Sequence, residues 1–309
     1  MAYNLKLMEG DTLKVFLIGT GGPFPNEVRL GPCVAFIAAG EFFLIDVGPG
    51  TFRIVSLMRL PTPFLNKILL THFHSDHIGD LGEANMISWA NGRENAIEVY
   101  GPKGVEDIVN GFNMAYNHDT GYRMAHHGSE VLSPEAGKLK SNIIKFDDPN
   151  ERVLVFEKDG LEVYAFVVDH FPVKPAVGYR IEYKGNVVVV TGDTVKTDNL
   201  VKHCKEADML ITEAISFDLL NQMVGGLKRS GLEKMGKIML DVQTYHMKPV
   251  DAAQVAKEAG VKKLVYVHVT PPIPNEASEK RYLQGVSDIF DGEVIMGKDR
   301  MKFKLKPKS

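Results

Sequence analysis

The sequence His72-Phe73-His74-Ser75-Asp76-His77 holds three imidazoles and one carboxylate within six positions. It directly follows an apolar run at residues 67–71, which predicts a β-strand. So many polar groups at the end of a buried strand cost free energy unless a ligand satisfies them. Neutral imidazole and carboxylate are ordinary ligands of divalent metals. The stretch therefore predicts a metal site, and its position inside the chain argues against the simpler alternative of a solvated polar run.

Composition is that of an ordinary globular protein, with 309 residues, 44% hydrophobic and 24% charged. Lys and Arg total 36 against 39 Asp and Glu, a net charge of −3 that lacks the basic field typical of nucleic-acid binding. We therefore do not expect nucleic acid as a partner. No membrane span or signal peptide is visible, so we expect a soluble protein, and its compartment stays open: cytoplasmic, or periplasmic or secreted if a leader was removed. Cys33 and Cys204 leave one disulfide or two free thiols as alternatives.

Short apolar runs alternate with helix-like segments along the whole chain. Residues 13–18, 187–190, 209–212 and 264–267 are such runs, and 187–190 is apolar throughout, as in a strand covered on both faces. This alternation indicates layered α/β packing, which we assign to a single domain over residues 1–309.

Polar residues recur where these predicted strands end. Asp169-His170 follows one strand, Thr191-Gly192-Asp193-Thr194 follows the next, and His268 ends a third. Loops at strand ends are where α/β proteins usually place ligands and chemistry. A single His or Asp there is more often structural, but several strands ending this way beside a His cluster favour one shared site.

This series of residues resembles the ligand series of the metallo-β-lactamase superfamily, in order and rough spacing over nearly the whole chain. The resemblance implies a four-layer αββα sandwich with two metals at one edge of the sheets. One metal would take His72, His74 and His170. The other would take Asp76, His77 and His268, and Asp193 would bridge the two.

Two divalent ions are thus the implied cofactors, with zinc as the default and iron or manganese as alternatives. A paired centre can hold a hydroxide that acts as the nucleophile near neutral pH. Asp46 would lie behind the ligands and orient an imidazole, or it would simply cap a turn.

Two further residues resemble the branch that contains tRNase Z and the zinc arylsulfatases. His246 lies 22 positions before His268, and Glu213 follows the strand after Asp193. In that branch a Glu–His pair sits beside the metals, where the His stabilises a charged oxygen or protonates the leaving group. We therefore take Asp76, His246 and Glu213 as catalytic residues. A structural imidazole at the start of the helix from Pro249 is the alternative for His246.

Long-form tRNase Z proteins carry a basic arm between the residues that match His170 and Asp193. Here these residues are only 23 positions apart, so no arm fits. We therefore expect a metal-dependent hydrolase of small anionic esters, either an aryl sulfate or a phosphodiester. The alternatives are a β-lactamase or lactonase, a tRNA 3′ endonuclease of the tRNase Z type, and a binding protein without turnover.

Residues 101–150 are helix-like and rich in polar aromatics, and we interpret them as a helical insertion. As a lid, the insertion would place Tyr116 and Tyr122 against substrate. As a dimer interface, it would support the homodimer that we expect. Lys174, in the loop after His170, is a further candidate substrate contact or only a solvated charge.

Overall fold

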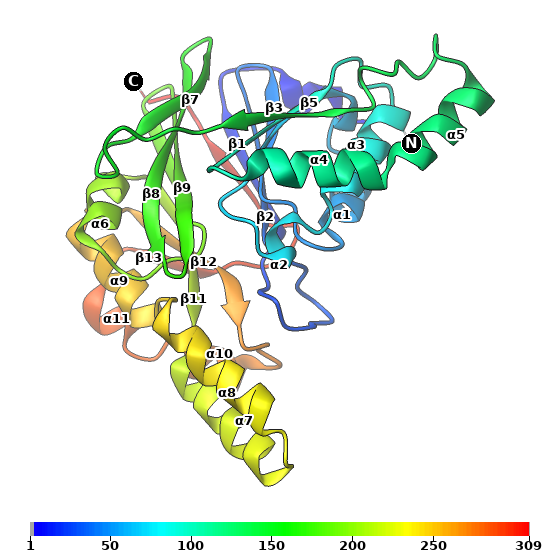
Figure 1. The fold of residues 1–309 in the computed structure, drawn as a ribbon. Coiled ribbons are helices and arrows are strands. Elements are labelled where there is room, and N and C mark those ends of the chain that lie inside the picture. The colour runs from blue at the N-terminus through cyan, green and yellow to red at the C-terminus, as the bar shows by residue number, and fades with distance from the viewer. Residues whose placement is uncertain (1–2, 309) are drawn as a thin grey trace.

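The apolar runs form two seven-stranded mixed sheets in the computed structural model, which describes residues 3–308 (Figure 1). The order of the first sheet is β14 (Lys302–Leu305), β1 (Leu13–Gly19), β2 (Cys33–Ala38), β3 (Glu41–Ile45), β4 (Leu65–Leu69), β5 (Ile97–Gly101) and β6 (Leu139–Ile143). The order of the second is β13 (Glu293–Met296), β12 (Lys263–Thr270), β11 (Met209–Ile215), β10 (Asn186–Val190), β9 (Val173–Tyr183), β8 (Leu161–His170) and β7 (Val153–Lys158).

The two sheets pack face to face over a common apolar core. Phe36 and Phe43 of the first sheet and Tyr179 of the second are fully buried in the same cluster. The Phe36 and Phe43 rings stack with their centroids 5.2 Å apart. Removing such large side chains from water is the main favourable term that holds the sheets together.

Helices cover the outer face of each sheet, which completes the four layers that were predicted. The first sheet packs against α1 (Thr51–Leu57), α3 (Leu81–Ala90) and α4 (Val105–Ala115). The second packs against α6 (Asp198–Cys204), α9 (Pro249–Glu258), α10 (Glu276–Tyr282) and α11 (Val286–Ile289). The αββα fold class is therefore confirmed.

Parallel pairing brings the carboxyl ends of several strands to the same edge. Strands β3 to β6 are mutually parallel, and so are β10 to β13. Strand β8 runs in the same direction as β10, because each pairs antiparallel with β9. The loops that follow β4, β8, β10 and β12 can therefore meet at one edge of the sandwich.

Two segments differ from what the sequence suggested. Residues 101–150 contain α4 and α5 (Asn117–His127), but their last part forms β6, which pairs with β5 and belongs to the first sheet. Between β11 and α9, the helices α7 (Phe217–Arg229) and α8 (Glu233–Asp241) form a pair that projects from the sandwich (Figure 1).

The remaining short elements are the helix α2 (Ser75–Ile78) and three 3₁₀ turns at Leu5–Met8, Thr62–Phe64 and Val242–Thr244. Cys33 and Cys204 are buried free thiols, one on β2 and one at the end of α6. Within residues 3–308, no helix has both the length and the apolar character that a membrane crossing requires.

Candidate metal centre

Seven side chains singled out from the sequence converge at the edge where the strands of both sheets end. They come from the loop after β4, from α2, from the last residue of β8, from the loop after β10 and from β12. The set is His72, His74, Asp76, His77, His170, Asp193 and His268. All but His74 and Asp76 are buried, and His74 faces solvent, so the cluster is open on one side.

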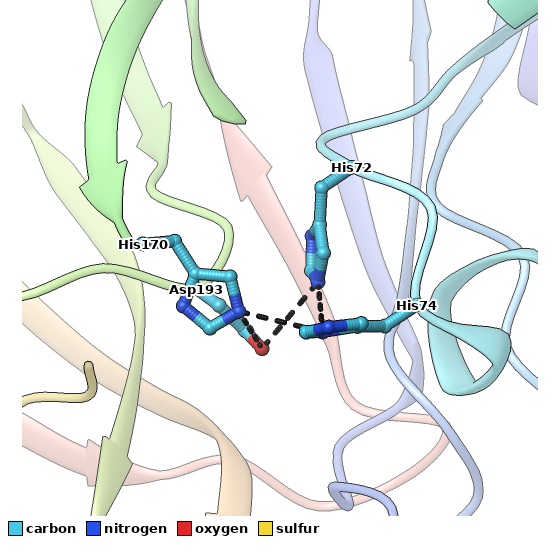
Figure 2. A group of neighbouring side chains, drawn as sticks. All are labelled: His72, His74, His170 and Asp193. Carbon is cyan, nitrogen blue, oxygen red and sulfur yellow. Dashed lines mark hydrogen bonds and ion pairs between the residues drawn. The ribbon is translucent and has the colours of Figure 1, made fainter. Parts of the chain in front are cut away.

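The first group consists of three imidazoles and Asp193, drawn in Figure 2. His72 Nε2 lies 2.9 Å from His74 Nδ1, and His170 Nε2 lies 3.4 Å from that same atom. Asp193 Oδ2 is 3.8 Å from His72 Nε2 and 3.9 Å from His170 Nε2. One ion between these atoms would draw all four side chains inward as ligands.

The second group consists of Asp76, His77 and His268. Asp76 Oδ2 lies 3.6 Å from His77 Nε2 and 3.3 Å from His268 Nε2. Asp193 Oδ2 is 3.3 Å from His77 Nε2 and 3.4 Å from His268 Nε2. The same carboxylate oxygen therefore faces both groups, which is the arrangement that a bridging ligand requires.

Local backbone geometry lets Asp193 approach the loop after β4. Gly192 has a φ of +62°, and a Cβ there would lie 2.8 Å from Thr71 Cβ. Because only glycine fits this close approach, Gly192 permits the loop after β10 to pack beside His72. His268 itself has a φ of 51°, a rare conformation for a residue with a side chain that is typically found at functional sites.

The donor set fits a divalent metal. The ligand atoms within each group lie within 4.8 Å of one another. His77 Nε2 faces the cluster, is buried and has no hydrogen-bond partner, which is costly for a polar atom. A cation would satisfy it, and mixed imidazole and carboxylate ligands suit zinc, iron or manganese.

The protonation states of the first ligand group suit metal binding, whereas in the second group burial is outweighed by the Asp193 carboxylate, which raises the pKa of His77 and of His268, so a metal would displace their protons. Burial lowers the pKa of His170 to about 4 and lowers the pKa of His72 well below its usual value. Burial by itself would raise the pKa of Asp193, but the neighbouring His268 and His77 imidazoles hold it well below its usual range. At neutral pH the first group therefore offers imidazole lone pairs beside an ionised carboxylate, as metal ligation requires.

Asp46 lies behind the ligands and contacts one of them directly. Its Oδ2 is 2.8 Å from His77 Nδ1 and also accepts a hydrogen bond from the Thr71 hydroxyl, while its Oδ1 accepts from the Thr71 amide. With Nδ1 of His77 bonded to the carboxylate, Nε2 is left to face the cluster. This geometry is what an orienting carboxylate provides to a metal-bound imidazole.

We expect the Asp46→Asn variant to bind metal about 10- to 100-fold more weakly, the usual cost of losing such a partner. Asn tolerates the left-handed φ of 56° at this position, so the backbone should be preserved. Chelator competition would measure the dissociation constant. Asp80→Asn is the matched control, because Asp80 accepts hydrogen bonds from the backbone amides of Gly50 and Phe52 rather than from an imidazole. Equal affinity in the two variants would contradict the role of Asp46.

Glu213 and His246 lie together beside the cluster. His246 Nδ1 is 3.2 Å from Glu213 Oε1, an ion-pair distance without good hydrogen-bond geometry. Glu213 Oε1 is fixed by the Met247 amide, 3.0 Å away. The His246 ring stacks on His268, with centroids 5.5 Å apart, and the His246 side chain lies within ligand range of Asp193.

The predicted substrate contacts are not brought into the cluster. Tyr116 packs against Gly82 of α3, and Tyr122 is 70% exposed on α5, at the far end of α4 from the cluster (Figure 1). No contact with the ligand cluster is described for either tyrosine, so their role as substrate contacts stays a prediction. Lys174 lies closer, at the start of β9, with its ammonium 5.0 Å from the Phe171 ring centroid.

Two groups that support the ligands were missed in the sequence. The Thr71 hydroxyl lies 3.0 Å from His72 Nδ1 and links that imidazole to Asp46. His170 Nδ1 donates to the backbone carbonyl of Tyr245, 3.0 Å away, which leaves Nε2 free to bind metal. The role of Thr71 could have been predicted from its position directly before His72. The role of the Tyr245 carbonyl could not, because every residue has a backbone carbonyl.

An αββα sandwich with two adjoining His and Asp groups at one edge defines a metal-dependent hydrolase of the metallo-β-lactamase fold. The sequence model of the beta-lactamase superfamily domain matches residues 42–269. The chain belongs to this superfamily, as its ligand series implied.

Curated relatives extend along nearly the full chain. Ribonuclease Z of Mycobacterium bovis (strain BCG / Pasteur 1173P2) is 31% identical over 302 residues, which cover 96% of this chain and 99% of the relative. Ribonuclease Z of Mycobacterium avium (strain 104) is 32% identical over 290 residues, covering 93% and 96%.

Solved structures share the fold. Human tRNase Z, short form, superposes with a TM-score of 0.65 at 23% identity, covering 95% of this chain and 99% of that one. The metallo-beta-lactamase fold protein YhfI from Bacillus subtilis gives a TM-score of 0.66 at 19% identity, covering 95% and 100%.

These relatives overturn one expectation from the sequence. We expected nucleic acid not to be a partner, but full-length relatives at 31% and 32% identity are ribonucleases. The inference failed because a net charge of −3 is a sum over the whole chain. Phosphate binding depends on the local electric field around clustered cations, and the net charge of the whole chain does not report that field.

Proposed function

We propose that this protein is a metal-dependent endoribonuclease that hydrolyses a phosphodiester bond at the 3′ side of precursor tRNA. The observation that carries the proposal is the Glu213–His246 pair, which lies beside a complete set of seven candidate ligands. Full-length similarity to ribonuclease Z favours this substrate over the aryl sulfates and other small esters that the sequence alone suggested.

The proposed centre holds two divalent ions, most simply zinc because imidazole nitrogens predominate. When bound, such ions supply Lewis acidity and make water nucleophilic near neutral pH. His72, His74 and His170 would hold one ion, and Asp76, His77 and His268 the other. Asp193 would join them, because one of its oxygens faces both groups.

His246 is the group best placed to move a proton. Its Nδ1 faces Glu213, which leaves the other ring nitrogen for substrate above the cluster. In its protonated form the imidazole would donate to the leaving oxygen of the phosphodiester. Glu213, held by backbone amides of Thr194 and Met247, would stabilise that charged form and keep the ring in place.

Cleavage of a labelled precursor tRNA, followed on a denaturing gel, tests this proposal. We expect a single cut at the 3′ end of the mature domain and about two metal equivalents per chain by elemental analysis of protein purified without chelator. Intact precursor together with rapid turnover of an aryl sulfate would show that the small-ester alternative is the correct one. Less than one metal equivalent would contradict the paired centre.

A further inference from the structure

A groove of about 910 Å³ adjoins the metal centre and takes no part in the chemistry described above. One wall comes from the end of β8 and the start of β9, and it includes Val168, Asp169 and Lys174. The other wall comes from the residues that follow β5 and β6, including Lys103 and Lys145. Asp169 in its wall directly precedes the candidate ligand His170 on β8, so the groove lies close to the centre.

The groove combines an apolar floor with a basic rim. Val168, Ala176 and Ile144 are buried in the floor, whereas Lys103, Lys145 and Lys174 are exposed. The two acids in the lining are Glu106 and Asp169, and each accepts a hydrogen bond from a nearby backbone amide. The exposed ammonium groups are thus a local cation cluster in a chain whose net charge is negative.

An exposed aromatic ring contacts one of the groove lysines. Phe171 directly follows His170 and is 64% exposed, which is unusual for so large an apolar side chain. Its ring lies under the Lys174 ammonium. The groove wall also holds Asn199, whose amide nitrogen donates to Val167 and Pro149 carbonyls and whose buried Oδ1 has no partner.

We infer that this groove binds unpaired RNA nucleotides that continue from the cleaved bond, an inference that rests on the proposed endoribonuclease function. A groove that tracks phosphates with cations and stacks bases on aromatic rings is the usual device for single-stranded nucleic acid. The volume suits a ligand of a few nucleotides rather than a duplex. Lys103, Lys145 and Lys174 contact phosphates, and Phe171 stacks with a base.

Binding of a fluorescein-labelled hexaribonucleotide, measured by anisotropy at several salt concentrations, tests the groove directly. Lys145→Ala combined with Lys174→Ala should weaken binding about tenfold or more. The slope of log affinity against log salt should fall by about 1.4, because each phosphate contact on a single strand contributes about 0.7. Phe171→Ala should weaken binding about 5- to 100-fold through lost stacking, and Phe171→Tyr should restore it.

The matched control is Lys302→Ala combined with Lys304→Ala on β14, at the opposite edge of the first sheet from β6. It removes the same charge and should leave affinity and salt slope unchanged. Hydrolysis of a small bis-aryl phosphate should stay at the wild-type rate in this control and in Lys145→Ala alone, because that reaction reports the metal centre. For precursor tRNA, the groove variants should raise KM and leave kcat unchanged.

The outcomes separate the two proposals. Wild-type affinity and salt slope in the groove variants, or no binding of the hexaribonucleotide to the wild-type protein, would overturn the groove as an RNA site even if precursor tRNA is cut. Groove-dependent binding without any cut in precursor tRNA would overturn the endoribonuclease and keep the groove. Loss of small-ester turnover in Lys145→Ala would overturn a binding role, since that side chain would then act on the centre.

Discussion

Asp193→Ala is expected to remove bound metal from at least one of the two groups and to abolish hydrolysis. Asp193 Oδ2 lies 3.3–3.9 Å from four imidazole nitrogens, two in each group. No other described side chain faces both groups in this way. Metal ions contribute several kcal/mol to such reactions, so we expect turnover to fall by at least about 10³-fold. Elemental analysis should show about one metal equivalent or fewer per chain.

Two further variants make this result interpretable. Asp193→Asn keeps the shape of the side chain and removes its charge, so it separates loss of ligation from loss of packing. Asp291→Ala changes an exposed carboxylate in the turn before β13 and should keep both metal and activity. If Asp193→Ala retained two metal equivalents, the bridging role would be wrong. A cooperative unfolding transition of the Asp193→Ala variant, with a midpoint near that of the metal-free wild type, would establish that the variant is folded.

His246→Ala is expected to keep its metal and to lose activity. Its ring stacks on His268 and faces Glu213. The first group, with three imidazoles and Asp193, and the second, with two imidazoles and Asp76, are both complete without it. Loss of a positioned acid–base group typically lowers turnover by about 10²–10⁴.

His203→Ala is the control that separates the loss of an acid–base group from the loss of any buried imidazole. His203 is a buried imidazole that packs on Phe166 and faces the Asn150 carbonyl, on the outer side of the second sheet. Its replacement should reduce stability and leave turnover of the folded protein unchanged. Glu213→Gln should lower turnover less than His246→Ala, because Glu213 acts only through its contact with the His246 ring. Unchanged turnover in His246→Ala would assign that residue to structure alone.

The metal ligands could be predicted from local sequence because each follows an apolar run that must form a buried strand. Polar residues directly after such runs, as at His72, Asp193 and His268, are placed at a sheet edge by the strand itself. Strand β6 was missed because three consecutive polar residues, Lys140 to Asn142, separate Leu139 from Ile143, which is a weak strand signal inside a stretch that otherwise suggests helix. No motif in the sequence of α7 and α8 indicated that this helix pair would project from the sandwich.

The sequence alone predicted the layered fold from its strand patterns, and its resemblance to the superfamily supplied the seven candidate ligands and the Glu213–His246 pair. The tertiary structure decided which groups face each other. It placed one oxygen of Asp193 toward both ligand groups and gathered Lys103, Lys145 and Lys174 around one groove. Those lysines are up to 71 positions apart, and a local electric field depends on distances in space that neither composition nor net charge contains.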